Sequence, residues 1–77
     1  MERIIYIQLL GEGTRVFRPV PALLIEDGLY ELRGHELYDP KDEIWEFPPG
    51  TLVLAEQRFL SGGAALIAVR ESKTSNV

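Results

Sequence analysis

With 77 residues, the chain has room for one small domain, and its 45% of hydrophobic residues favours a globular fold over a disordered one. Eight basic against twelve acidic residues give a net charge of -4, which disfavours binding to the phosphate backbone of nucleic acids. The absence of cysteine excludes disulfides, thiolate nucleophiles and cysteine-bound zinc.

The N-terminal half is patterned as strands. Residues 4–10 alternate with one apolar face, formed by Ile5, Ile7 and Leu9. A glycine-rich turn over 11–14 leads into a long strand over 14–25, in which Pro19 and Pro21 cannot donate hydrogen bonds. That strand is therefore predicted to be an edge strand at the prolines, or to carry a bulge.

A hairpin follows directly. Asp27-Gly28 between two apolar runs predicts a two-residue primed turn, and 29–33 then alternates with Tyr30 and Leu32 facing inward. Residues 34–43 form a polar loop that holds at most one short turn of helix.

The C-terminal half continues the pattern. A short segment over 44–47 ends at Pro48-Pro49-Gly50, where Pro49 fits the first central position of a turn. Strands are predicted over 51–56 and 64–69, joined by a turn at 61–63. We expect one domain over 1–71 with a flexible tail over 72–77.

These elements predict an all-β fold, a small five-stranded SH3-like antiparallel barrel. An immunoglobulin-type sandwich needs roughly 100 residues, more than this chain has. The apolar run at the N-terminus is too short for a signal peptide or a membrane span, and cysteine is absent. We therefore expect a cytoplasmic protein that binds neither membranes nor nucleic acid.

No catalytic or metal signature stands out. The single histidine, His35, lies in a polar loop with no nucleophile placed beside it by the pattern. The acids near it lack the ligand ladder and central glycine of a calcium loop. We predict no catalytic residue, no metal and no cofactor.

Aromatic and acidic side chains concentrate between residues 36 and 47. They suggest a shallow platform for a basic or proline-rich peptide, although Trp45 is favoured as a core residue because a thin core needs its largest side chain inside. The candidate binding surface is Phe17, Tyr38, Asp39, Asp42, Glu43 and Trp45.

Arg18 falls on the apolar face of its strand and needs a carboxylate there. Glu43 and Glu46 are the two candidates, and Arg18 with Glu46 is the predicted structural clasp.

Several short sequence patterns occur one after another in this chain. Glu12-Gly13-Thr14, Arg18-Pro19-Val20 and Asp42-Glu43 are followed by Trp45-Glu46-Phe47 and Pro49-Gly50. This set resembles a group of small uncharacterised bacterial proteins, some carried as integron gene cassettes. The resemblance covers residues 4–70 and implies a small β-barrel and a bacterial, cytoplasmic origin, with no activity or site residue to carry over.

The function expected from these features is a non-enzymatic module that binds a basic protein or peptide. Two alternatives stay open: an acidic inhibitor or immunity-type protein that covers a basic surface, and a small-ligand or catalytic site at the interface of a homo-oligomer.

Overall fold

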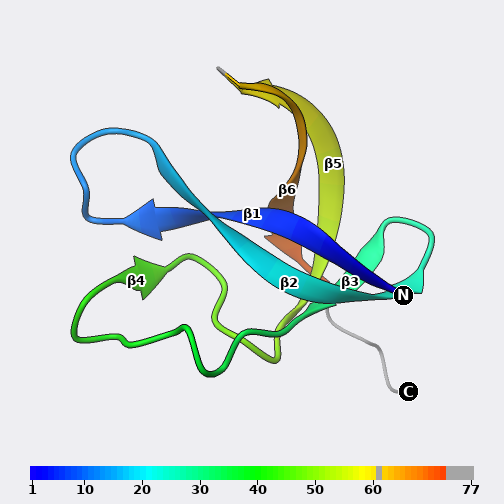
Figure 1. The fold of residues 1–77 in the computed structure, drawn as a ribbon, viewed down its shortest axis with the longest axis horizontal. Helices are drawn as coiled ribbons and strands as arrows, with labels where there is room; N and C mark the ends of the chain where they lie inside the picture. Colours follow the sequence, from blue (N-terminus) through cyan, green and yellow to red (C-terminus); the bar gives the residue numbers. More distant parts are fainter. Residues whose placement is uncertain (61, 73–77) are drawn as a thin grey trace.

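The computed structural model describes residues 1–60 and 62–72, which form six strands and no helix (Figure 1). Two turns occupy the loop between the third and fourth strands, closed by Tyr38 N–H to Gly34 O and Glu43 N–H to Asp39 O. The strands are β1 (Glu2–Leu10), β2 (Val16–Glu26), β3 (Leu29–Leu32), β4 (Ile44–Trp45), β5 (Leu52–Leu60) and β6 (Gly63–Glu71).

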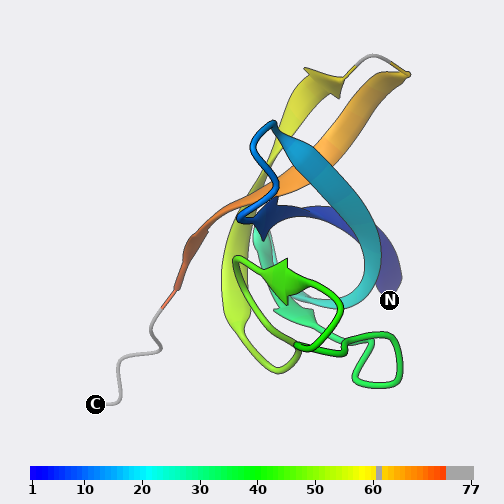
Figure 2. The ribbon, with the colours of Figure 1, turned by 90° about the vertical axis from the view of Figure 1, so that its left-hand side faces the viewer.

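Five of the strands close into a ring in the order β1, β2, β3, β5, β6, which is seen from its open end in Figure 2. The pairings are antiparallel except for β1 with β6, which are parallel where Tyr6 meets Ile67. The two-residue strand β4 is added at the end of β1. The predicted small all-β barrel is confirmed, with one parallel contact among its pairings.

The core lies inside this ring and follows the alternation of the strands. Ile5, Ile7 and Leu9 point inward from β1, and Tyr30 and Leu32 from β3, as the sequence predicts. Trp45 is only 2% exposed and is the largest fully buried side chain. A domain of this size has a thin core, so burying its largest residue fills the space most effectively.

The two prolines of β2 lack an N–H group on the side of the strand that faces away from β1. Leu24 N–H donates to Met1 O, so N–H groups at even positions point to β1 and those at odd positions point away from it. Pro19 and Pro21 are odd, and the register of β1 with β2 runs through both without a shift. Of the two alternatives for this strand, the edge is present at Pro19 only, because Pro21 O accepts a hydrogen bond from Arg33 N–H over 2.8 Å, and there is no bulge at either proline.

The turn at Asp27-Gly28 differs from its prediction. A primed turn requires positive φ at its first central residue, but no non-glycine residue of the described chain has positive φ, while Gly28 has φ 80°. The β2–β3 register shifts between Leu24 and Glu26 instead. This irregularity adds the local twist that a primed turn would have supplied.

The turn at Pro48–Thr51 forms as predicted. Thr51 N–H donates to Pro48 O over 3.2 Å, which places Pro49 at the first central position and Gly50, with φ 93°, at the second. This is the arrangement of a type II turn, where glycine is needed for its positive φ.

The β5–β6 hairpin is longer than predicted and extends out of the ring as an arm (Figures 1 and 2). The β3 strand pairs with β5 only over Leu52–Leu54, and β1 pairs with β6 only at Ile67. Beyond these contacts β5 and β6 pair with each other as far as Leu60 and Gly63. Ser72, assigned to the flexible tail, donates its N–H to Leu52 O; the rest of that predicted tail lies outside the described residues.

Candidate functional site

The predicted aromatic platform is largely inside the protein. Trp45 is buried, and the ring of Tyr38 packs against it with centroids 4.7 Å apart and an interplanar angle of 54°. Trp45 Nε1 donates a 2.9 Å hydrogen bond to Glu43 Oε1, which satisfies the one polar atom of the indole. These contacts make Trp45 a core residue rather than a surface for recognition.

Arg18 pairs with Glu43, and the predicted clasp with Glu46 does not form. Arg18 Nε lies 3.5 Å from Glu43 Oε1, close enough for an ion pair but without hydrogen-bond geometry. Glu43 lies two positions before the buried Trp45, on the same side of the segment, whereas Glu46 lies on the opposite side and is exposed.

A small hollow of about 170 Å³ collects three of the predicted acids. Asp39, Asp42 and Glu43 line it together with Arg18 and Leu37. The backbone N–H of Lys41 donates to Asp39 Oδ1 over 3.0 Å, which fixes this part of the loop. The described residues include no group of three or more metal-ligating side chains arranged to hold an ion.

Phe17 lies apart from these acids. It neighbours Arg18 on a regular strand, so the two side chains project from opposite faces. Arg18 joins the small hollow, while Phe17 lines a second and larger one. The predicted binding surface is thus divided between two places on the molecule, while Trp45 is buried and the partly buried Tyr38 packs against it.

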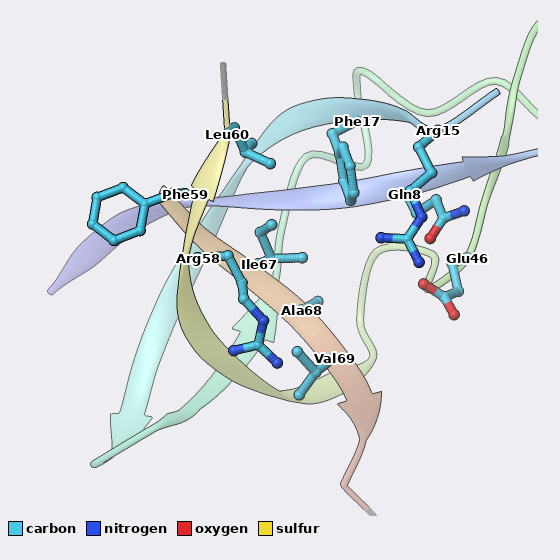
Figure 3. A pocket seen from close by; sticks show the side chains of 10 residues that line it. All are labelled: Gln8, Arg15, Phe17, Glu46, Arg58, Phe59, Leu60, Ile67, Ala68 and Val69. Carbon is cyan, nitrogen blue, oxygen red and sulfur yellow. The ribbon is translucent and has the colours of Figure 1, made fainter. Parts of the chain in front are cut away.

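The larger hollow, here called the groove, has a volume of about 570 Å³ (Figure 3). It lies between the β1–β2 pair and the β5–β6 arm. Its apolar side chains are Phe17, Phe59, Leu60, Ile67, Ala68 and Val69, and its polar ones are Gln8, Arg15, Glu46 and Arg58. In Figure 3 the ring of Phe59 points away from the other lining residues, and Phe59 is 87% exposed.

The sequence analysis missed most of the groove because the strand that it predicted over 51–56 ends at Glu56, whereas β5 continues to Leu60. The arm carries Arg58, Leu60 and Ile67, which form one wall. A usable signal was present: Phe59 and Leu60 are two large apolar residues directly before a glycine turn, beyond the last residue that the core pattern explains.

Comparison of the chain with protein-family models, with curated proteins and with solved structures gives no match. The resemblance to small bacterial cassette proteins accordingly stays a prediction. Within the described residues there is also no helix with the length and apolar character needed to cross a bilayer.

Proposed function

We propose that this protein is a non-enzymatic module that binds a protein or peptide partner in the groove. The observation that carries the proposal is an open hollow walled by apolar side chains from separate strands, next to a phenylalanine that is 87% exposed. Exposed apolar patches on small proteins commonly mark interaction sites, since covering them releases their hydration water.

The chemistry of the rim supports recognition over catalysis. Arg15, Glu46 and Arg58 are exposed to solvent around an apolar interior. A protein interface has this arrangement, with an apolar centre and a polar rim. Catalytic acids and bases, in contrast, are usually held in partly buried positions that tune their protonation. The cysteine-free composition is consistent with a cytoplasmic location, which belongs to the same proposal.

A peptide-display selection tests the proposal. Random peptides are selected on the wild-type protein and then measured against Leu60→Glu, which places a charge in the groove wall. Leu37→Glu is the matched control, because Leu37 is exposed and lines the small hollow instead. We expect selected peptides to lose binding to the first variant only. Failure to select any peptide, or equal binding to both variants, would contradict the proposal.

The acidic inhibitor is the second candidate, and the small hollow favours it. Asp39 and Asp42 are exposed there, and Glu43, which also lines the hollow, pairs with Arg18. A basic partner would associate quickly at low salt and more slowly as salt screens these charges. Association that is insensitive to Asp39→Asn and Asp42→Asn would rule this candidate out.

A further inference from the structure

We infer that the arm joins two copies of this chain, with the β6 edges of both copies paired antiparallel about a two-fold axis at Ala64. The inference goes beyond the proposed function, because it uses the backbone edge of the arm and not the groove. The arm extends from the ring, so the edges of its two strands are accessible to another molecule (Figures 1 and 2).

Hydrogen bonds fix the side to which each backbone group of β5 points. Leu52 O accepts from Ser72 N–H on the β6 side, and Ala55 N–H donates to Gly28 O on the opposite side. Successive residues of a strand alternate between its two sides. Even positions of β5 therefore bond toward β6, and odd positions direct their N–H and C=O groups away from it.

The backbone of β6 has free groups on the side that faces away from β5. Even positions of β5 stand opposite odd positions of β6 along the arm, as Arg58 does with Ala65. Ala64 and Leu66 therefore direct backbone groups away from β5, toward the side on which β1 joins. Among the described residues, β1 pairs with β6 at Ile67 alone, so no strand lies beside the N–H and C=O groups of Ala64.

The β6 edge also lacks the features that protect two other free edges of the molecule. The free edge of β2 includes Pro19, which has no N–H, and the free edge of β5 carries Glu56 and Arg58. From Gly63 to Leu66, β6 has no charged residue, no proline and no register shift. An exposed apolar edge without such features is a template for pairing with another strand.

A second copy of the chain fits this edge. With the axis at Ala64, the two Ala64 residues face each other and exchange two N–H to C=O hydrogen bonds. Ala65 of each copy then faces Gly63 of the other, so no side chain larger than a methyl group obstructs the approach. None of these residues is charged, so two copies with a net charge of -4 each place no like charges face to face at the axis.

The same arrangement covers Phe59. Phe59 stands opposite Ala64 across the hairpin, so the two side chains lie on the same face of the arm. In the four-stranded sheet made by two arms, in the order β5, β6, β6, β5, the methyl groups of both Ala64 residues lie between the two Phe59 rings. Small alanines leave room for the rings to lie over them, and covering rings that are 87% exposed favours association.

Sedimentation equilibrium of the wild-type protein tests the inference. Because the contact is confined to the ends of two arms, it belongs to the small, weak class of interfaces, and concentrations from about 10 µM to about 1 mM cover the expected Kd. We expect the average mass to rise over this range from that of one chain toward that of two.

Two matched pairs of variants locate the contact. Ala64→Pro removes the N–H that each copy donates at the axis and leaves the β5–β6 bonds intact, so the dimer should be weaker by roughly fivefold to a hundredfold. Gln57→Pro removes an equally exposed N–H on the free edge of β5 and should change the Kd by less than about twofold. Ala64→Lys and Gln57→Lys change the net charge equally, but only the first opposes two like charges at the axis, an effect that added salt should reduce.

Urea unfolding followed by Trp45 emission checks that each variant is folded, and the lysine pair decides the test if Ala64→Pro does not fold. A mass of one chain over the whole concentration range would refute the inference. Equal weakening by the Ala64 and Gln57 variants, or weakening by the Gln57 variants alone, would also refute pairing through β6. Each of these results leaves recognition in the groove standing, because the peptide selection measures it separately.

Discussion

The carboxylate of Glu43 is expected to stabilise the fold mainly through the indole of Trp45 and only secondarily through Arg18. Its Oε1 accepts the 2.9 Å hydrogen bond from Trp45 Nε1, an atom of a residue that is 2% exposed. The same oxygen lies 3.5 Å from Arg18 Nε, in a pair whose side chains are 35% and 28% exposed. Replacing Glu43 in two different ways separates these contributions.

Glu43→Ala leaves a buried indole N–H without a partner, which costs about 1–3 kcal/mol, and also removes the ion pair. The ion pair contributes at most about 1 kcal/mol, because its two side chains, about a third exposed, are still partly screened by water and salt. Glu43→Gln keeps an acceptor for the indole and loses only the charge. We therefore expect a loss of about 2 kcal/mol for alanine and of about 1 kcal/mol or less for glutamine.

Urea unfolding followed by the emission of Trp45, the only tryptophan, measures both variants. Arg18→Met is the control that leaves the indole bond intact, and it should cost no more than about 1 kcal/mol. Added salt should shrink the effects of Glu43→Gln and Arg18→Met, but not the difference between alanine and glutamine. If alanine and glutamine at position 43 differ by less than about 0.5 kcal/mol, the reasoning about the indole is wrong.

Two further predictions concern stability. Gly34→Ala should cost about 1–3 kcal/mol in urea unfolding, because Gly34 has φ 91° and a Cβ there would lie 3.4 Å from both Pro21 Cδ and Val20 Cγ1. Gly62→Ala, at a position without positive φ and with open space around it, should change stability by less than about 0.5 kcal/mol; equal costs would contradict the role of strain. Ile7→Ala should lower the free energy of unfolding by about 2–5 kcal/mol because Ile7 is fully buried, whereas Phe59→Ala should be nearly neutral; a large loss for Phe59 would show that the arm packs on the barrel.

Local alternation was sufficient to predict the inner faces of the ring. Ile5, Ile7 and Leu9 on β1, and Tyr30 and Leu32 on β3, follow a period of two, and Trp45 is buried as its size favours. The period of two also places Glu43, two positions before Trp45, on the same side as the buried indole, and Glu46 on the opposite side. Alternation would therefore have selected Glu43 over Glu46 as the partner of Arg18. That error came from an incomplete use of the pattern rather than from missing information.

The arm and the groove depend on pairing that a single segment does not reveal. Glu56, Gln57 and Arg58 have no strong preference for strands, yet they pair with Ile67, Leu66 and Ala65 across the hairpin. β-propensity reflects the neighbours of a residue as much as the residue itself. The turn at Asp27-Gly28 is similar, because the register shift beside it removed the need for a primed turn. The groove, which needs the arm and β1–β2 together, could not be located without their arrangement in space.

The contact between Tyr6 and Ile67 joins β1 to β6, the first and the last strand of the described residues. During synthesis, β1 leaves the ribosome long before β6 is made. Until then, the side of β1 that pairs with β6 has no β6 partner at Tyr6. Closing such a long stretch of chain is slow relative to forming local hairpins. The barrel is thus expected to become complete only after translation has passed its final strand, and a nascent chain cut short before residue 67 would expose an unpaired, strongly apolar edge to other polypeptides.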